Sequence, residues 1–426
     1  MTKAQVIQVS KPAVATHDGL RAVFAGTPGR LRTAGAAAIA ACLLFGVVSF
    51  LSVNARSSAI SSARKQAAQL VLVQGIRSSL TQADAAATNA FLVGGLEPAD
   101  QQQSYSNGIA NASAALGAAN LSSPADAATL AKVNAVLTQY TGLIESARAN
   151  NRQGFPIGAA YLRQASALLR SDALPQLSAV AASQQARITD AYNRSAAANT
   201  LLIVTLVLAF LVLAAIQGWL SFKTRRTVNV NLAAATVAVL VVGLIGMALM
   251  AFAQHSATNV RNGSLANTVA LSTARTNAFD AKSDESLTLI ARGSGQPFED
   301  AYKVATTNAS TALTGDANQS VVTPSLGALT LYEKAHTNVR AKDDVGNFDA
   351  AVALATTNVQ TGTKATFAAF DATSQAALTS QASHVSNGLS SARNTLGVLA
   401  LLLLLVGLIS AALSWRGVAV RLREYR

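Results

Sequence analysis

The sequence LLIVTLVLAFLVLAAIQGWLSF occupies residues 201–222, KTRRTVNVN follows at 223–231, and LAAATVAVLVVGLIGMALMAF completes the stretch at 232–252. Each apolar segment has about 20 residues and no charged side chain, which is the length of a helix that crosses a bilayer core. The connecting segment has no acid, and its basic residues are Lys223, Arg225 and Arg226. Short basic loops stay on the cytoplasmic side of a membrane. The stretch therefore predicts a membrane hairpin with a cytoplasmic turn.

Two further apolar segments, 34–53 and 396–413, have the same character. The composition, with 51% apolar and 12% charged residues, is too apolar for an ordinary soluble protein and agrees with four spans. The four predicted spans are residues 34–53, 201–222, 232–252 and 396–413. The predicted cytoplasmic segments are a basic tail (1–33), a turn (223–231) and a second basic tail (414–426). The two predicted extracytoplasmic bundles are residues 54–200 and 253–395.

The positive charge of the chain is concentrated beside these spans. Of the formal net charge of +13, ten units lie in the two tails and the turn. This distribution indicates membrane topology and contact with anionic lipid, and it argues against nucleic acid as a partner. We therefore expect a multi-pass protein of the cell membrane with both termini in the cytoplasm. The only cysteine, Cys42, lies in the first span, so the external segments have no disulfide within one chain.

Helical periodicity continues after the first span. Its apolar stripe consists of Leu72, Ile76, Leu80, Ala83, Ala87 and Phe91, and Gly94 predicts where this helix ends. A second helix is predicted from Pro98 to about Leu116.

Ser123 and Pro124 predict the start of a third helix. Its stripe consists of Leu130, Val133, Leu137, Tyr140, Ile144 and Ala147. The helix should end near Gly154. A fourth helix should open at Pro156 and continue into the second span, with a bend near Pro175.

The second external segment repeats this plan. The sequence predicts a helix that ends at residues 292–295, a second from Pro297, a third from Thr323 and Pro324, and a fourth from about Phe348 that runs into the last span. The echoes between the segments are Asn111–Leu116 with Asn308–Leu313, Tyr140 with Tyr332, Arg148 with Arg340, and Arg77 with Arg275. The predicted fold is an all-α membrane protein with four transmembrane helices and two extracytoplasmic four-helix bundles in tandem repeat, a fused pseudo-dimer.

Motifs for chemistry are not found in the sequence. The four histidines lack metal-ligand spacing, and phosphate-loop, nucleophile-elbow and kinase signatures are missing. The acid pairs 284–285, 299–300 and 343–344 are interpreted as solvated charges on helix faces or at helix ends. The spans carry no charged side chain, which disfavours a transporter. We expect no catalytic residue, no metal, no cofactor and no enzymatic activity.

The turn between the third and fourth helices of the first bundle is the best candidate binding site. It combines Arg148, Asn150, Asn151 and Arg152, which could hold a carboxylate or an acidic partner surface. The alternative is that the arginines only complete the helix end. Further candidate anion-binding residues are Arg77, Arg275 and Arg340.

The arrangement of span, four-helix bundle and span resembles the sensor half of bacterial chemoreceptors. Over the whole chain, two such units with the segment ESARANNRQGFPIGAAYLR at 145–163 resemble the actinobacterial four-span membrane protein family that is paired with a glutamine-binding lipoprotein and the soluble Ser/Thr protein kinase G. This resemblance implies a solute-binding lipoprotein outside, which captures amino acids, and a cytoplasmic Ser/Thr kinase, reached directly or indirectly, as partners. It carries no map of ligand residues.

The expected function is a non-enzymatic transmembrane signal transducer that senses amino-acid availability through the lipoprotein. The residues expected to relay the signal inside are Lys223, Arg225, Arg226, Arg416, Arg421 and Arg423. Two alternatives stay open: direct sensing of a small ligand by the bundles, as in chemoreceptors, and a structural role in the envelope.

Overall fold

The structure is a computed structural model that describes residues 26–94, 97–224, 229–315 and 317–423. Every regular element in these residues is helical, so the all-α prediction is confirmed. The chain divides into two compact units. The span unit comprises Met1–Ser57, Ala196–Phe252 and Thr395–Arg426. The bundle unit comprises Ser58–Ser195 (the first half) and Ala253–Asn394 (the second half).

The span unit contains the apolar parts of α2 (Gly26–Val93), α6 (Leu174–Thr224), α7 (Val230–Asn259) and α12 (Thr363–Arg423). Among the described residues, four helices are long and apolar enough to cross a membrane, as predicted. Their outward apolar side chains agree with a lipid environment, because residues such as Leu44, Leu208 and Leu401 are exposed.

Two glycines allow α2 and α12 to approach closely inside the span unit. A Cβ placed on Gly407 would lie 2.5 Å from the Cα of Gly46, so neither position has room for a side chain. Small residues at such crossings permit backbone contact between membrane helices. One turn before Gly46 in α2, the Cys42 Sγ lies 3.7 Å from the Ser414 Oγ of α12.

The first half of the bundle unit follows the predicted order of helices. After α2 come α3 (Ala99–Ser122), the short 3₁₀ turn η1 (Pro124–Asp126), α4 (Ala127–Arg152), α5 (Ile157–Leu168), the π-helical turn η2 (Leu169–Ala173) and α6. The predicted stripe of α4, from Leu130 to Ala147, is buried along its whole length. Gly94 ends α2 with a φ of 70°, a left-handed conformation that glycine adopts without strain.

The second half contains α7, the π-helical turn η3 (Val260–Leu265), α8 (Ala266–Ile290), α9 (Gln296–Thr314), α10 (Gln319–Asp343), α11 (Phe348–Thr356) and α12. Its core is richer in aromatic rings than that of the first half. The Phe367 ring packs edge-on against Phe279 and Tyr332, with centroids 5.0 and 5.1 Å away.

Two local predictions were wrong. The third helix of the second half begins at Gln319 and encloses Pro324, because the Asn318 side chain accepts the backbone N–H of Ser320 and caps the helix one turn earlier. The fourth helix is split into α11 and α12, since Thr356 and Thr357 bond back to the carbonyls of α11 and the chain turns before Gly362. Near Pro175, where a bend was predicted, the structure has the π-helical turn η2, which ends at Ala173.

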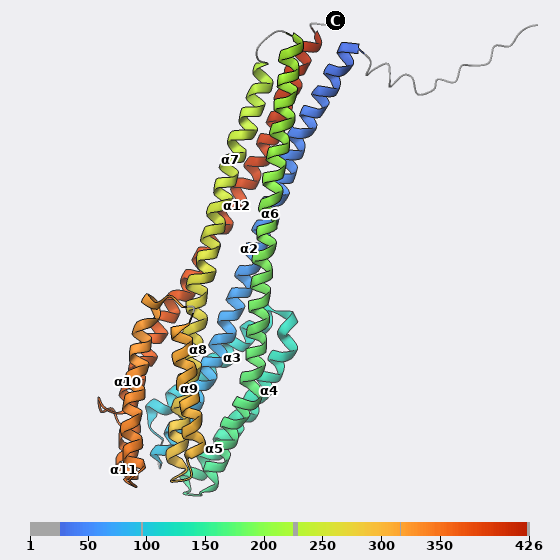
Figure 1. Cartoon of the computed structure of the whole chain (residues 1–426). Coiled ribbons are helices and arrows are strands. Elements are labelled where there is room, and N and C mark those ends of the chain that lie inside the picture. Colours follow the sequence, from blue (N-terminus) through green and yellow to red (C-terminus); the bar gives the residue numbers. More distant parts are fainter. Residues whose placement is uncertain (1–25, 95–96, 225–228, 316, 424–426) are drawn as a thin grey trace, which may run out of the picture. The chain divides into compact units, whose positions relative to one another are not determined.

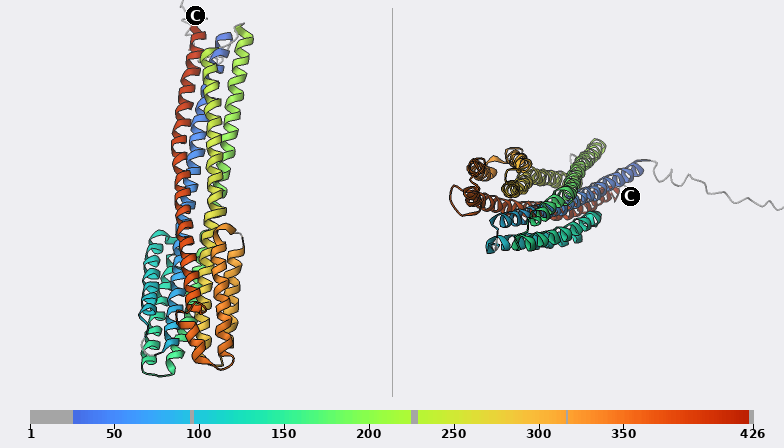
Figure 2. Two further views of the ribbon diagram at one scale, coloured as in Figure 1. Left: turned by 90° about the vertical axis from the view of Figure 1, so that its left-hand side faces the viewer. Right: turned by 90° about the horizontal axis from the view of Figure 1, so that it is seen from below.

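The two halves pack against each other within the bundle unit. In both views of Figure 2 the teal helices of the first half and the orange helices of the second half lie on either side of the longer helices. Lys364 of α12 bonds Asp100 of α3 at 2.8 Å, and the Tyr192 hydroxyl of α6 donates to the Ala257 carbonyl of α7 at 3.0 Å. The fused pseudo-dimer of the sequence analysis therefore has direct contacts between its halves.

Candidate functional site

The turn between α4 and α5 is built by one glycine and one proline. The Phe155 N–H donates to the Asn150 carbonyl at 2.9 Å, and Gly154 has a φ of 73°, the left-handed geometry of a helix C-terminus. Pro156 then precedes the first residue of α5, where its missing N–H costs nothing. This turn brings the last residues of α4 next to the segment that joins α2 to α3.

Arg148 is held by two carboxylates and one aromatic ring. Its Nη2 lies 2.8 Å from Glu97 Oε1, its Nη1 lies 2.8 Å from Glu145 Oε1, and its guanidinium stacks 4.1 Å from the Tyr105 centroid. Burial would lower the pKa of Arg148, but the charges of Glu97 and Glu145 outweigh it and raise this pKa. Burial raises the pKa of Tyr105 to about 12. Arg148 is thus positively charged, and its guanidinium is held in place by these contacts.

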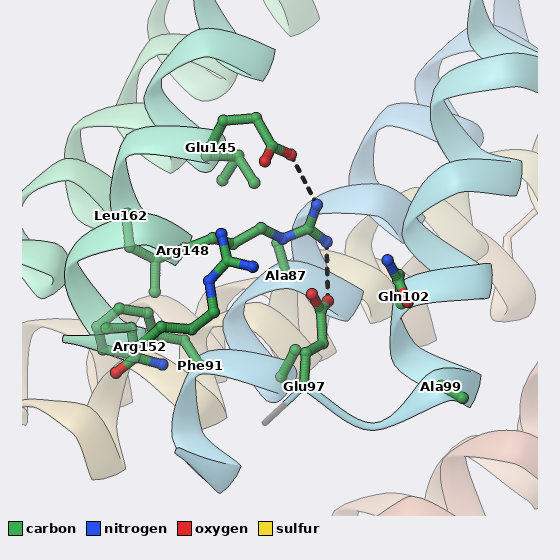
Figure 3. Close-up of a pocket in the computed structure, with 13 residues that line it drawn as sticks. Ala87, Phe91, Glu97, Ala99, Gln102, Glu145, Arg148, Arg152 and Leu162 are labelled. Carbon is green, nitrogen blue, oxygen red and sulfur yellow. Dashed lines mark hydrogen bonds and ion pairs between the residues drawn. The ribbon is translucent and has the colours of Figure 1, made fainter. Parts of the chain in front are cut away.

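A cavity of about 360 Å³ opens beside Arg148. Figure 3 shows Arg148 and Arg152 extending from α4 at its edge, with Glu97 opposite them. The apolar lining comes from α2, α3, α4 and α5: Ala87, Ala90, Phe91, Ala99, Ile144, Ala147 and Leu162. The polar lining comprises Glu97, Gln102, Glu145, Arg148, Asn151 and Arg152. The cavity therefore combines an apolar floor with a rim that carries both signs of charge.

The structure brings together some of the candidate binding residues and separates others. Asn151 and Arg152 line the cavity with Arg148, and Arg152 has no ion-pair partner among the described residues. Asn150 instead donates its amide to the Ser146 carbonyl at 2.8 Å. Arg77, on α2, donates to the Gln74 side chain at 3.0 Å.

The second-half candidates are engaged by acids of their own half. Arg275 is 3% exposed, and its guanidinium contacts the Asp371 carboxylate at 2.6 Å and the Ser374 hydroxyl at 2.8 Å. Arg340 contacts Asp343 and Asp344. An external anion would have to compete with these bonds.

The relay candidates lie at the ends of the span helices. Lys223 is in the last turn of α6, Arg421 and Arg423 are in the last turn of α12, and Arg416 of α12 is exposed. Arg225 and Arg226 lie outside the described residues.

A buried cluster of charges joins the two halves, and sequence reasoning missed it. Asp84 of α2 accepts from the Ser166 hydroxyl of α5 and from the Ser283 hydroxyl of α8, both at 2.7 Å. Arg170, in the η2 turn of the first half, contacts Asp284 of α8 at 2.5 Å and Asp280 at 3.7 Å. The cluster therefore connects α2, α5 and η2 of the first half to α8 of the second.

Asp280 and Asp284 of this cluster have raised pKa values. Burial raises the pKa of Asp280 to about 7 against the attraction of Arg170, and it raises the pKa of Asp284 to about 6. The like charge of Asp84 acts in the same direction on both groups.

A second buried network lies inside the second half. The His336 ring contacts Glu285 through Nδ1 at 2.8 Å and Glu299 through Nε2 at 3.1 Å, and it stacks on Tyr302 at 3.6 Å. Lys282 and the Thr363 hydroxyl complete the bonds to Glu285. Although burial disfavours the charge of Glu285, Lys282 and His336 lower its pKa to about 2. Burial lowers the pKa of His336, but the bonds of both ring nitrogens to carboxylates outweigh it and raise this pKa. A carboxylate oxygen accepts hydrogen bonds, so both ring nitrogens donate and the ring is an imidazolium.

The interpretation of the acid pairs as solvated was wrong for three residues. Asp284, Glu285 and Glu299 are buried, because each contacts a basic side chain from another helical element: Arg170 for Asp284, and His336 for Glu285 and Glu299. Asp300 is exposed, as expected. A signal was present in the sequence, since Asp280 and Asp284 lie four residues apart on one helix face and Asp84 lies within a run of alanines, small residues at which helices can approach closely.

The side chains of these acidic clusters do not have the arrangement of metal ligands. Within the described ranges, no group of three or more His, Cys, Asp and Glu side chains could hold a metal ion.

Comparison with known proteins adds one finding. A family model described as the actinobacterial sensor domain matches residues 59–193, about a third of the chain, which includes the Arg148 cavity and Asp84. No curated protein and no solved structure matches the chain. The first half of the bundle unit is thus similar to an actinobacterial sensor domain, and this likeness supports a multi-pass membrane protein with a sensory, signalling role.

Proposed function

We propose that the protein is a non-enzymatic transmembrane signal transducer that senses amino-acid availability through an extracytoplasmic solute-binding lipoprotein of the glutamine-binding type. The observation that carries this proposal is the sensor-domain likeness of residues 59–193 in a chain with four membrane-length helices. The bundle unit is its external input region, and the basic segments beside the spans face the cytoplasm of the cell.

The α4–α5 turn is the proposed contact with the lipoprotein. Phe155 and Ile157 are more than half exposed and lie beside the exposed Arg152. Exposed aromatic, aliphatic and arginine side chains in one patch are typical of protein interfaces. The corresponding turn of the second half has Asn347 after its glycine, where the first half has Phe155. One partner would thus bind one half and make the repeat asymmetric.

The helices offer a route for the signal. α2, α6 and α12 each run without interruption through residues of both units. Binding that favours one packing of α4 against α2 would bias the positions of these helices, and small helix shifts are a common form of switching. The residues that would relay the signal in the cytoplasm are Lys223, Arg225, Arg226, Arg416, Arg421 and Arg423. They would act on a Ser/Thr kinase directly or through another protein.

A charge-reversal experiment tests the contact. Arg152→Glu combined with Phe155→Asp should abolish co-purification of the lipoprotein from cross-linked membranes and should make phosphorylation by the kinase insensitive to external amino acids. Lys132→Glu, an exposed change on the same helix, is the matched control and should leave both readouts intact. Normal co-purification and normal signalling in the double variant would contradict the proposal.

Direct sensing of a small ligand is the second candidate, and the cavity beside Arg148 favours it. Ligand cavities in proteins have volumes of about 300–1,000 Å³, an apolar lining and a few polar groups. In this case the purified protein would bind the ligand without a lipoprotein. If the protein has a purely structural role in the envelope, neither co-purification of the lipoprotein nor binding of a small ligand would be observed.

A further inference from the structure

The cavity of the first half has an equivalent place in the second half, and the repeat identifies it. The spacing that pairs Tyr140 with Tyr332 also pairs Arg148 with Arg340. The same spacing pairs Ile144, in the cavity wall, with His336.

The other helices give matching correspondences. The spacing that pairs Arg77 with Arg275 places Glu285 at the position of Ala87. The spacing that pairs Asn111–Leu116 with Asn308–Leu313 places Glu299 at the position of Gln102.

These positions come together in both halves. Ala87, Gln102, Ile144 and Arg148 all line the cavity in the first half. Their counterparts in the second half contact one another: His336 bonds both Glu285 and Glu299, and Arg340 lies 3.5 Å from Glu299.

The tyrosine that supports the site is also repeated. The spacing that pairs Asn111–Leu116 with Asn308–Leu313 also pairs Tyr105 with Tyr302. Tyr105 stacks under the Arg148 guanidinium, and Tyr302 stacks under the His336 imidazolium. In each half the ring therefore supports a cation at the same site.

We propose that the cavity beside Arg148 binds a small zwitterion, a molecule with both a carboxylate and a cationic nitrogen, and that Glu285 and His336 permanently fill the equivalent place in the second half. The chain would then have one open ligand site and one that holds its own side chains as the occupant.

The charges on the rim suit such a ligand. A carboxylate entering the cavity meets Arg152, which has no ion-pair partner among the described residues. A cationic nitrogen meets Glu145, whose carboxylate is 61% exposed, and Glu97. The carbon skeleton between the two charges would contact the alanine floor and Phe91. Both charges of the ligand contribute, because its carboxylate would supply the counter-ion that Arg152 lacks in the described part of the chain, and its cationic nitrogen would add a second cation to Glu97 and Glu145, which both bond Arg148.

The role of this cavity as an input rests on the proposed function, and titration calorimetry on the full-length protein in nanodiscs tests the binding separately. The probes are L-histidine and β-alanine as zwitterions, with acetate and imidazole as probes of one function each. We expect at least one zwitterion to bind at one site per chain and more than 10-fold more tightly than acetate or imidazole. No binding by either zwitterion, or equal binding of acetate, would overturn the inference.

Two variants locate the site. Ala87→Glu with Ile144→His transplants the second-half occupant and should abolish zwitterion binding, whereas Ala114→Glu with Leu121→His, on the exposed surface of α3, should not. Arg152→Gln changes an exposed side chain, so the fold is retained, and it should weaken binding more than 10-fold while Arg163→Gln has no effect. Unchanged affinity in Arg152→Gln, or in the transplant variant, would overturn the site.

The outcomes separate this inference from the proposed function. Zwitterion binding without any change of kinase output would leave the cavity assignment intact and contradict the transducer. A kinase response that needs the lipoprotein, in a protein that binds neither zwitterion, would contradict the cavity assignment alone.

Discussion

Arg170 of the first half and Asp284 of the second half are joined by a hydrogen bond of 2.5 Å between Nη1 and Oδ1. Asp284 is 2% exposed, so this bond lies inside the bundle unit. Arg170 belongs to the π-helical turn η2, and such turns often mark functional positions in helices. The pair is therefore a direct, buried polar connection by which a change in the first half could alter the second.

Arg170→Met should destabilise the bundle unit by about 2 to 4 kcal/mol, because it leaves the buried Asp284 carboxylate and the half-buried Asp280 carboxylate without their cation. Chemical denaturation of the purified protein measures this change. Arg163→Met, an exposed arginine on α5, is the control and should change the free energy of unfolding by less than about 0.5 kcal/mol. Equal stability of the two variants would show that the pair contributes nothing.

The raised pKa values of Asp280 and Asp284 predict that stability falls as pH rises. The folded protein retains protons up to about pH 7 and 6 at these groups, whereas the unfolded chain releases them near 3.8. Unfolding therefore releases protons between about pH 4 and 7, and the free energy of unfolding decreases over that window. The charged groups that face Asp280 are Arg170, Asp284, Asp84 and Arg77.

Asp280→Asn should make this decrease shallower and raise the stability at pH 8 by about 1 to 2 kcal/mol, a value reduced for the partial exposure of the side chain. Denaturation curves measured from pH 4 to 8 show the effect. Asp300→Asn, on the surface of α9, should keep the wild-type slope. A slope that Asp280→Asn leaves unaltered would rule out Asp280 as its source.

Much of this fold follows from local sequence. Uninterrupted apolar runs define the spans, and Gly94 and Gly154 end helices where predicted, since each takes a left-handed conformation that other residues avoid. The stripe on α4 depends only on helical spacing. Pro324 misled the prediction because the cap at Asn318 starts α10 earlier.

The interior charges were harder to predict. Asp284 is buried because Arg170, far away in the sequence, reaches it from the other half, and no local pattern contains that information. The Arg148 turn was found because its polar residues are contiguous. The cavity beside this turn was not predicted, since Ala87, Gln102 and Leu162 come from three other helices.

His336→Gln should destabilise the second half by about 2 to 4 kcal/mol at neutral pH, since it removes the cation between Glu285 and Glu299. The wild-type contribution is complete below the ordinary histidine pKa and is lost as pH rises through the raised value. The protection factors of the α8 to α10 amides against hydrogen exchange, which are corrected for the intrinsic exchange rate at each pH, should therefore fall as pH rises in the wild type and vary less in the variant. His384→Gln, which is exposed, is the matched change; equal protection of both variants would refute a role for the His336 cation.

Gly407→Val should separate α2 from α12 in the membrane, because a Cβ at this position meets the backbone of Gly46. We expect a lower thermal transition in detergent and a weaker response to the input. Gly397→Val tests the same substitution on the same helix, where a Cβ has no neighbour within 4 Å. If both variants melt together, close packing at Gly407 is not required.

If the protein relays a signal as proposed, the bundle unit faces the outside while the basic segments face the cytoplasm. In a Cys42→Ser background, Leu121→Cys places a thiol on a residue of the bundle unit that is 90% exposed, and Arg416→Cys places one in the exposed end of α12. Labelling of intact cells with a membrane-impermeant maleimide is the decisive measurement. We predict that Leu121→Cys is labelled at once and that Arg416→Cys is labelled only after permeabilisation; the opposite pattern would contradict the account.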